Sequence, residues 1–346
     1  MNKTTGYVGI LVASRKQRKY MLKQYLDNNA SNMKLYCFTP TSINWGQKRI
    51  VGLHRLNGQW VESLFPFPQV VYNRCYNRDS KLIERLEAVI GRNKCFNHIN
   101  RFNKHIVSKK LSRWLAPHLP ETVLYDKELA VHFLWTHRHM YFKPCFGNKG
   151  KGVYRVELKD SGEIEIGYHH YTPHIIVGDM AQFQERIQQL LGSTPYVMQK
   201  GIHVKPLGEQ TFDIRVLVQK NKSGQWAVTN VVSRIAHKGY FNTSICENVC
   251  LSQDILTQLY SPEEMNAILC SIYDTSLRAA EILEIDGRHH LAELSVDFVL
   301  DNEGHGWIIE VNGKPSKDLY DGIHKRYRVY KRPMEYAKYL SKYRSN

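Results

Sequence analysis

The stretch that decides the fold of this chain reads Ser295-Val296-Asp297-Phe298-Val299 and, after a turn, Trp307-Ile308-Ile309-Glu310-Val311-Asn312-Gly313-Lys314-Pro315. Both halves are apolar runs of strand length, so they predict the two strands of a hairpin. Glu310 and Asn312 are two residues apart and point to the same side of their strand, and the partner strand brings Asp297 beside them. Mg²⁺ prefers such oxygen ligands, shared with phosphate oxygens. A polar sheet edge facing water fits less well, because the neighbours on each strand are apolar.

A second group of candidate residues surrounds Lys143. The apolar strand His139–Pro144 is followed by Gly147-Asn148-Lys149-Gly150-Lys151-Gly152, and a strand resumes at Val153. This order predicts an antiparallel hairpin with a flexible basic loop, and not the strand-to-helix turn of a P-loop. Backbone N–H groups and ammonium groups of such a loop can close over phosphates. Taken alone, a solvated turn with Lys143 extended along the surface explains the pattern equally well.

Two arginines form a third group. The segment Thr211–Val218 alternates so that Asp213 and Arg215 share one face of a strand, and the segment from Trp226 to Ala236, which carries Arg234, is the expected partner strand. A guanidinium group suits a bidentate grip on carboxylate or phosphoryl oxygens. Asp213 fits equally well as a plain ion-pair partner of either arginine.

The pattern of elements predicts a mixed α/β and α+β fold in three parts. Strands alternate with helices up to about residue 95, which indicates an N-terminal α/β lobe over residues 1–95. Two α+β subdomains are expected over residues 96–195 and 196–346. Ser261 followed by Pro262 is an N-cap and N1 signal for a helix that runs to about Ile285.

Composition limits the classes of function. A formal charge of +16 favours anionic partners such as nucleotide phosphates, acidic polymers, nucleic acid or an anionic surface. The basic, tyrosine-rich segment Lys325–Asn346 is best explained as an amphipathic helix that packs on the body; a nucleic-acid arm and a surface for an acidic substrate are the alternatives. No run of apolar residues is long enough for a membrane span, and no secretory signal is recognisable, so a cytoplasmic location is expected. Seven scattered cysteines give little support to a disulfide framework or a zinc cluster.

Taken together, these residues resemble the ATP-grasp superfamily, whose motifs occur in the same order. The resemblance covers roughly residues 100–315 and is carried by Lys143-Pro144, the glycine loop, Gln199-Lys200-Gly201-Ile202, Asp213-Ile214-Arg215, Asp297 and Glu310-Val311-Asn312. Within the superfamily, Tyr72-Asn73-Arg74 and the lead from Phe96-Asn97 to Lys104 resemble the YheC/YheD group of endospore coat-associated proteins from spore-forming Gram-positive bacteria.

The resemblance implies an ATP-grasp fold in which ATP lies between two α+β subdomains, with Mg²⁺ or Mn²⁺ beside it. The implied nucleotide contacts are Lys104, Lys143, Gly147, Lys149, Gly150, Gln199, Lys200, Ile202 and, for the ribose, Glu209. The implied metal ligands are Asp297, Glu310 and Asn312. The implied catalytic residues are Lys143, Arg215 and Arg234, and the implied substrate contacts are Asp213, Arg234 and Asn242. The chain departs from the pattern at Lys200, where an acid is common, and at Thr243–Glu247, where glycines are expected.

The activity implied is an ADP-forming carboxylate–amine ligase that works through an acyl phosphate. Its acyl donor and its amine are unknown, and the net charge points to an acidic peptide or polymer. The group's name links it to sporulation, to the mother-cell cytoplasm and to the spore coat surface. Phosphoryl transfer to a hydroxyl and a spore-surface binding protein with little turnover are the alternatives. A nucleic-acid binder is suggested only by charge and leaves the acidic cluster unexplained.

Overall fold

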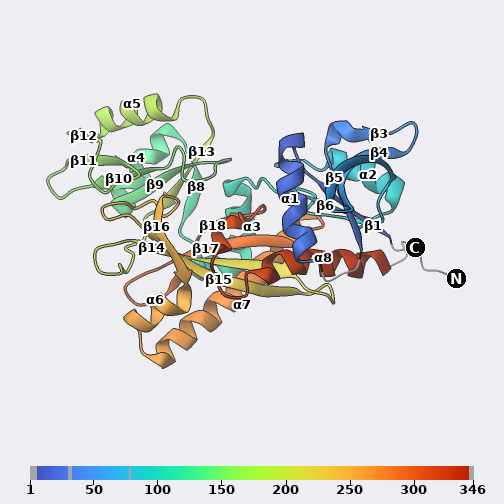
Figure 1. Ribbon diagram of the computed structural model, residues 1–346. Helices are drawn as coiled ribbons and strands as arrows, with labels where there is room; N and C mark the ends of the chain where they lie inside the picture. Colours follow the sequence, from blue (N-terminus) through green and yellow to red (C-terminus); the bar gives the residue numbers. More distant parts are fainter. Residues whose placement is uncertain (1–5, 30–32, 78, 343–346) are drawn as a thin grey trace.

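Three sheets make up the protein, and the computed structural model describes residues 6–29, 33–77 and 79–342 of it (Figure 1). The expectation about a secretory signal falls partly on residues 1–5 and that about the tyrosine-rich segment partly on residues 343–346, and both stretches lie outside the described residues. No helix in the described part of the chain is both long enough and apolar enough to cross a bilayer.

The first sheet is N-terminal and has seven strands in the order β3-β4-β2-β1-β6-β7, with β5 paired to β4. Its strands are β1 (Tyr7–Leu11), β2 (Lys34–Phe38), β3 (Ile43–Asn44), β4 (Arg49–Leu56), β5 (Gln59–Pro66), β6 (Val70–Asn73) and β7 (Cys95–Phe96). β2, β1, β6 and β7 run parallel. Helices α1 (Arg15–Asp27) and α2 (Lys81–Ile90) accompany them. Asn57-Gly58, a dipeptide typical of hairpin turns, joins β4 and β5, and both residues have the positive φ that this turn requires.

The second sheet is antiparallel, with the order β12-β11-β10-β9-β13-β8. Its strands are β8 (Thr122–Leu124), β9 (His139–Pro144), β10 (Tyr154–Leu158), β11 (Ile164–Tyr168), β12 (Ile175–Val177) and β13 (Tyr196–Lys200). Helices α4 (Lys127–His137) and α5 (Met180–Leu191) pack on one face, where Met140, Phe142 and Met198 enter the core. Because side chains alternate along a strand, Tyr141, Lys143 and Gln199 lie on the opposite face.

The third sheet is antiparallel, with the order β16-β15-β14-β17-β18. Its strands are β14 (Phe212–Lys220), β15 (Trp226–Ala236), β16 (Cys246–Leu251), β17 (Glu293–Leu300) and β18 (Gly306–Asn312). Helices α3 (Lys104–Leu115), α6 (Ser252–Leu259) and α7 (Pro262–Gly287) cover one face. α7 begins at the expected cap: Ser261 and Glu264 form a reciprocal capping box, and Pro262 is the first helical residue. α3 precedes the second sheet in the chain but packs against the third, because Leu111 and Leu115 belong to that core.

Alternation along β14 divides the third sheet into two unlike faces. Ile214 and Val216 enter the core under α3 and α7. Asp213 and Arg215 point the other way, and their direct cross-strand partners on that face include Arg234 and Asp297. Further along the same face, Leu217 packs in the core that the sheet shares with the first sheet. One face is therefore polar at one end and apolar at the other.

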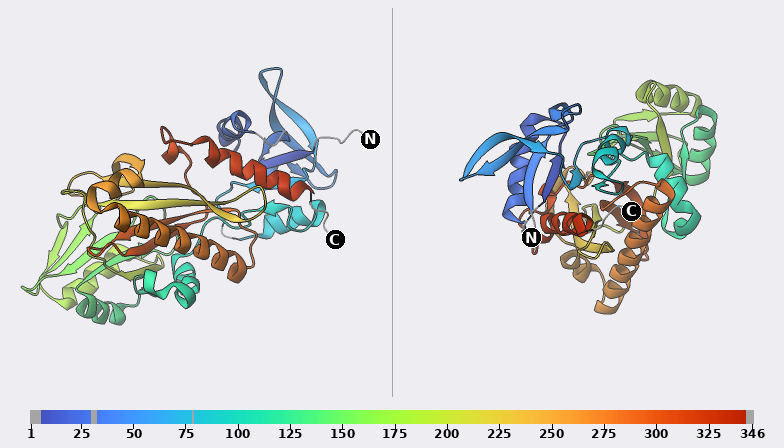
Figure 2. Two further views of the ribbon diagram at one scale, coloured as in Figure 1. Left: turned by 90° about the horizontal axis from the view of Figure 1, so that it is seen from below. Right: turned by 90° about the vertical axis from the view of Figure 1, so that its right-hand side faces the viewer.

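The C-terminal helix α8 (Tyr327–Lys342) covers the apolar end of that face. Its buried side chains, Tyr330, Tyr336 and Leu340 among them, share one core with β1, β6, Leu217 and Val232. Figure 2 shows α7 and α8 on opposite faces of the five-stranded sheet. The amphipathic helix expected from the tyrosine spacing is confirmed, and it fixes the N-terminal lobe to the third sheet. Three short 3₁₀ turns complete the elements: η1 (Pro40–Ser42), η2 (Ala116–His118) and η3 (Asp318–Tyr320).

Candidate active site

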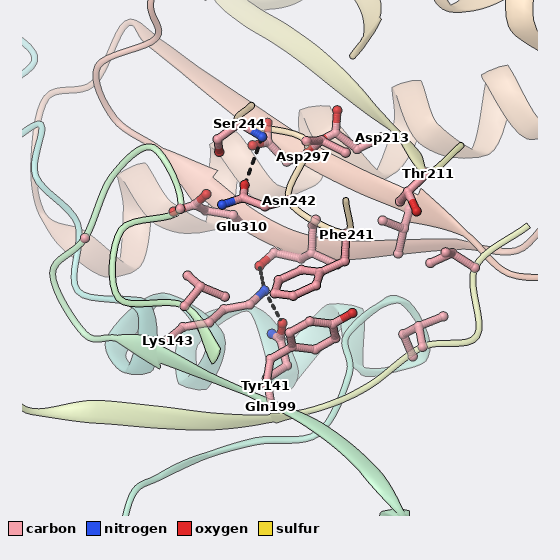
Figure 3. A pocket seen from close by; sticks show the side chains of 18 of the residues that line it. Tyr141, Lys143, Gln199, Thr211, Asp213, Phe241, Asn242, Ser244, Asp297 and Glu310 are labelled. Atoms are coloured by element: carbon pink, nitrogen blue, oxygen red, sulfur yellow. Dashed lines mark hydrogen bonds between the residues drawn. The ribbon is translucent and has the colours of Figure 1, made fainter. Parts of the chain in front are cut away.

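A pocket lies between the inner faces of the second and third sheets (Figure 3). Lys143, Gln199 and Tyr141 reach into it from β9 and β13, and Asp297 and Glu310 face them from β17 and β18. Twelve of the residues singled out from the sequence line this pocket. They are Lys104, Lys143, Gly147, Gly150, Gln199, Lys200, Ile202, Asp213, Arg234, Asn242, Asp297 and Glu310. Elements separated by more than 150 residues in the chain are thus brought to one cavity.

Lys143 is held by neutral oxygens at the bottom of the pocket. Its Nζ donates to Oε1 of Gln199 at 2.6 Å and to the backbone carbonyl of Ile309 at 3.3 Å. Ile309 has no partner in the β17–β18 register, since Asp297 pairs with Glu310 and Phe298 with Ile308. A bulge of this kind redirects the local backbone, and here it presents a carbonyl to the lysine. Burial lowers the pKa of Lys143 to about 8; Glu310 opposes this shift and Lys104 adds to it.

Glu310 pairs with Lys104, the first residue of α3. Nζ of Lys104 lies 2.9 Å from Oε1 of Glu310. Asn103 caps α3 by accepting bonds from the next turn of backbone N–H groups, and this fixes where Lys104 emerges. Burial alone would raise the pKa of Glu310, but the charges of Lys104, Lys143 and Arg215 lower it to about 2. Glu310 is therefore a carboxylate at neutral pH, beside two ammonium groups.

Asp297 is shared by two arginines. Its oxygens accept from Nε and Nη2 of Arg215 at 2.7 and 2.5 Å and from Nη2 of Arg234 at 3.2 Å. Arg234 also pairs with Asp213, with Nε to Oδ1 at 2.9 Å, so the ion-pair alternative for Asp213 is what the structure contains. Asn312 completes the set, with Nδ2 3.5 Å from Oδ2 of Asp297. Asp297, Glu310 and Asn312 share one face, as the spacing predicted.

The glycine-rich loop reaches across the pocket to the third sheet. Gly150 has φ of +65°, and a Cβ built there would lie 1.9 Å from Nδ2 of Asn242. A side chain at this position would be both strained and blocked. Asn242 is itself fixed, because its Oδ1 accepts from the backbone N–H of Ser244 at 2.9 Å and its Nδ2 lies 2.6 Å from Nδ1 of His169. The loop therefore closes against a rigid partner.

An apolar part of the pocket was not identified from the sequence. The rings of Tyr141 and Phe241 meet edge to face at 5.6 Å, and Val299 and Ile309 also line the pocket. The signal for two of these residues was present: Tyr141 stands two residues before Lys143, and Val299 two residues after Asp297, so each shares a face with a residue already chosen. Phe241 lies in a loop, where no periodicity could indicate it.

Four of the sequence candidates do not line this pocket. Glu209, the residue suggested for the ribose, is exposed and pairs with Lys238. Lys149 lies at the exposed tip of the glycine loop. Arg215 is buried behind Asp297, and Asn312 lines a small neighbouring cavity together with Lys104 and Glu310.

Comparison with known proteins identifies the family and the fold. Residues 92–340 match the model of the YheC/D-like ATP-grasp family. The chain is 28% identical over 332 residues to endospore coat-associated protein YheD of Bacillus subtilis (strain 168), covering 88% of this chain and 71% of that protein. Two solved structures share the fold. D-alanyl-alanine synthetase A from Vibrio cholerae O1 biovar eltor str. N16961 has a TM-score of 0.56 at 13% identity, covering 94% of this chain and 96% of that one. The ATP-grasp ligase PsnB, complexed with a phosphomimetic variant of its minimal precursor, Mg and ADP, has a TM-score of 0.57 at 13% identity, covering 95% and 98%. The chain therefore belongs to the YheC/D-like ATP-grasp family.

Proposed function

We propose that this protein is an ATP-dependent ligase that joins a carboxylate to an amine through an acyl phosphate. The observation that carries the proposal is the meeting of Lys104, Lys143 and Glu310 with Asp297 in one pocket, beneath a loop that only glycine can build at residue 150. Cations, carboxylates and a closable loop are what a magnesium-bound triphosphate requires.

The donor set fits such a group. Glu310 is ionised and flanked by two ammonium groups, so it can take one side of a divalent ion while Lys104 and Lys143 take phosphate oxygens. Asp297 and Asn312 lie beside it on the same face of the sheet and would complete the ligands. Hard oxygen ligands of this kind suit Mg²⁺, and Mn²⁺ can replace it.

Each residue of the pocket has a role in this proposal. Magnesium–ATP, when bound, supplies the transferable phosphoryl group and spreads its negative charge. Lys143 and Lys104 hold phosphate oxygens, and Arg234 faces the acyl phosphate and the substrate carboxylate with Asn242 beside it. Arg215 orients Asp297 from behind. The glycine loop keeps water out of the site.

Tyr141 and Phe241 form the apolar wall that would receive the base of the nucleotide. Gln199, Lys200 and Ile202 line the same part of the pocket, as expected for the segment whose backbone reads adenine. Glu209, which was suggested for the ribose, pairs with Lys238 at the surface and does not line the pocket.

The proposed reaction has two steps. A carboxylate oxygen of the acyl donor forms a bond to the γ-phosphorus as the bond to the bridging oxygen breaks, which gives an acyl phosphate and ADP. The amine nitrogen then attacks the acyl carbon, loses a proton, and phosphate leaves. Cationic side chains that are already in place stabilise the charge that develops in both steps.

The substrates and location follow from charge and from the relatives. A net charge of +16 favours an acidic acyl donor, such as a glutamate-rich peptide or polymer. The relative YheD is described as endospore coat-associated, so we place this protein in sporulation, in the mother-cell cytoplasm or at the spore coat surface.

One observation favours a second candidate. Both oxygens of Asp297 are engaged by arginines, and a metal ion would have to compete with them. In a nucleotide-binding coat protein with little turnover, Asp297 would stay paired with the two arginines and would not bind a metal ion. The two candidates differ in whether binding requires the metal and whether ADP is released.

The deciding experiment has two parts. The first measures the melting temperature with Mg-ATP, with ATP plus EDTA, and without nucleotide. The second measures ADP release in the presence of pools of amino acids, acidic peptides or sporulation extract. A ligand of the native state raises the melting temperature by mass action. Glu310→Ala should abolish the metal-dependent rise and retain the fold, whereas Lys149→Met, at the exposed loop tip, should behave as wild type. The absence of any rise at millimolar nucleotide would overturn the proposal; a rise without ADP release from any pool would favour the binding protein.

A further inference from the structure

A second group of ligating side chains lies far from the pocket, where the first sheet meets the third. Glu87 stands on α2, His98 follows β7, and His290 lies between α7 and β17. One ligating atom from each of the three lies within 4.8 Å of the others. We propose that Glu87, His98 and His290 bind a zinc ion that joins the N-terminal lobe to the third sheet.

The distances suit a shared metal ion better than a hydrogen bond. Oε1 of Glu87 and Nε2 of His98 are 3.3 Å apart, at the long end for a hydrogen bond. Two ligands of a tetrahedral zinc ion, at about 2.1 Å from the metal, stand roughly 3.4 Å apart. The pair is thus already at ligand spacing, and a ring nitrogen of His290 lies within 4.8 Å of both atoms.

Backbone contacts hold the three residues in place. Oε1 of Glu87 accepts the backbone N–H of Cys95 at 2.9 Å. The backbone carbonyl of His290 accepts from the N–H groups of Asn97 and His98 at 2.8 and 3.2 Å, so the segments that carry the two histidines are tied together.

His290 has one ring nitrogen engaged and one available. Its Nε2 lies 2.6 Å from the hydroxyl of Tyr336, which fixes the ring. Its Nδ1 is buried and makes no hydrogen bond of normal geometry among the described residues, although the backbone of Cys95 interacts with the ring, so this nitrogen can turn to a metal ion.

Access and a fourth ligand are provided by the surrounding cavity. Glu87, His98 and His290 line a cavity of about 650 Å³, and His289 lines it too, with its ring centre 6.4 Å from that of His98. A water molecule or His289 can take the fourth position of a tetrahedral ion. Arg92, Lys94 and Arg288 line the same cavity. These cations disfavour any divalent ion, whereas the two imidazole ligands favour zinc over magnesium, so we expect the site to select zinc.

The experiment uses the untagged full-length protein, loaded with zinc, dialysed against metal-free buffer and analysed for bound metal. We expect one zinc ion per chain in the wild type. The variant Glu310→Gln should also bind one zinc ion, because its change lies in the nucleotide pocket and not in the proposed zinc site. His98→Ala should lose the ion, and so should Glu87→Gln, which keeps an acceptor for the Cys95 N–H and is the safer variant for folding. His132→Ala removes an exposed histidine elsewhere and should retain it.

Two further measurements keep the proposal open to refutation. Tyr336→Phe should weaken zinc binding by about 10- to 100-fold, because it removes the group that orients His290. Cobalt(II) in place of zinc should give the visible absorption of a tetrahedral ion, which Glu87→Gln abolishes. Less than stoichiometric zinc in the wild type, or zinc retained by both His98→Ala and Glu87→Gln, would overturn the proposal.

Discussion

Replacing Glu293 with glutamine tests how the lobes are held together. Glu293 begins β17 and is buried at the junction of the first and third sheets. Its oxygens lie 2.5 Å from Nη1 of Arg74 and 2.8 Å from Nζ of Lys317, and they accept from the Tyr72 hydroxyl at 2.5 Å. One carboxylate is therefore shared by two buried basic groups that come from different lobes.

The magnitude follows from the charges left behind. Burial alone would raise the pKa of Glu293, but Lys317 and Arg74 lower it to about 2. A fall of about 2.5 units from the ordinary value near 4.5 corresponds to about 3 kcal/mol of stabilisation at neutral pH. Removing one partner of a buried ion pair typically costs about 3–5 kcal/mol, in agreement with that figure. We expect Glu293→Gln to lower the melting temperature by roughly 6 °C or more.

The pH dependence has a definite sign. Because the folded-state pKa lies below the unfolded value, the stabilisation from Glu293 is complete above about pH 4.5 and is lost as the pH falls toward about 2. Lys317 contributes in a different window, since burial lowers its pKa to about 7 from an ordinary value of 10.5. Of these two groups only Glu293 titrates between pH 2 and 4.5, so Glu293→Gln should make that limb of the curve less steep, while Glu310, whose pKa is also lowered to about 2, keeps part of it.

The assay is thermal melting across pH, with amide hydrogen exchange to locate the loss at the junction of the lobes. Glu303→Gln is the matched control, because Glu303 is an exposed residue in the turn of the same β17–β18 hairpin and should change stability by less than about 0.5 kcal/mol. If Glu293→Gln and Glu303→Gln melt together and keep the same acid limb, the account of this ion cluster is wrong.

Three further changes test the pocket and a helix start. Affinity for Mg-ATP, measured by calorimetry, should fall by up to about tenfold per pH unit above pH 8, because Lys143 with its lowered pKa then loses the proton that phosphate binding needs. Lys143→Met should bind Mg-ATP more weakly at pH 7, and its affinity should no longer depend on pH in this range. An unchanged slope in Lys143→Met would exclude Lys143 as the titrating group. Gly150→Ala should weaken Mg-ATP binding, because the added Cβ would lie 1.9 Å from Nδ2 of Asn242 and would force the loop away from its place over the pocket. Gly162→Ala, at an open turn with positive φ, is the control that measures backbone strain without such a contact. Ser261→Ala should destabilise the protein by about 1 kcal/mol in denaturant unfolding, through loss of the N-cap of α7, and no change would mean that the cap is not needed.

Much of the site could be predicted because local spacing determines which way a side chain points. The two-residue steps from Asp213 to Arg215 and from Glu310 to Asn312 placed each pair on one face of a strand. The capping signal at Ser261 is equally local and was confirmed, and the turn dipeptide Asn57-Gly58 between β4 and β5 is a signal of the same kind. Family membership followed from the order of such local motifs.

Only the tertiary structure decided which charges meet. Asp297 is held by both Arg215 and Arg234, and Glu293 joins residues more than 200 positions apart in the chain. Both arrangements follow from the packing of sheets and not from any periodicity. The bulge that presents the Ile309 carbonyl to Lys143 depends likewise on the pairing of two strands. Sequence fixes the direction of a side chain within its own element, but its partner is chosen by the three-dimensional contacts between elements, and the energy of a charge depends on that partner and on its burial.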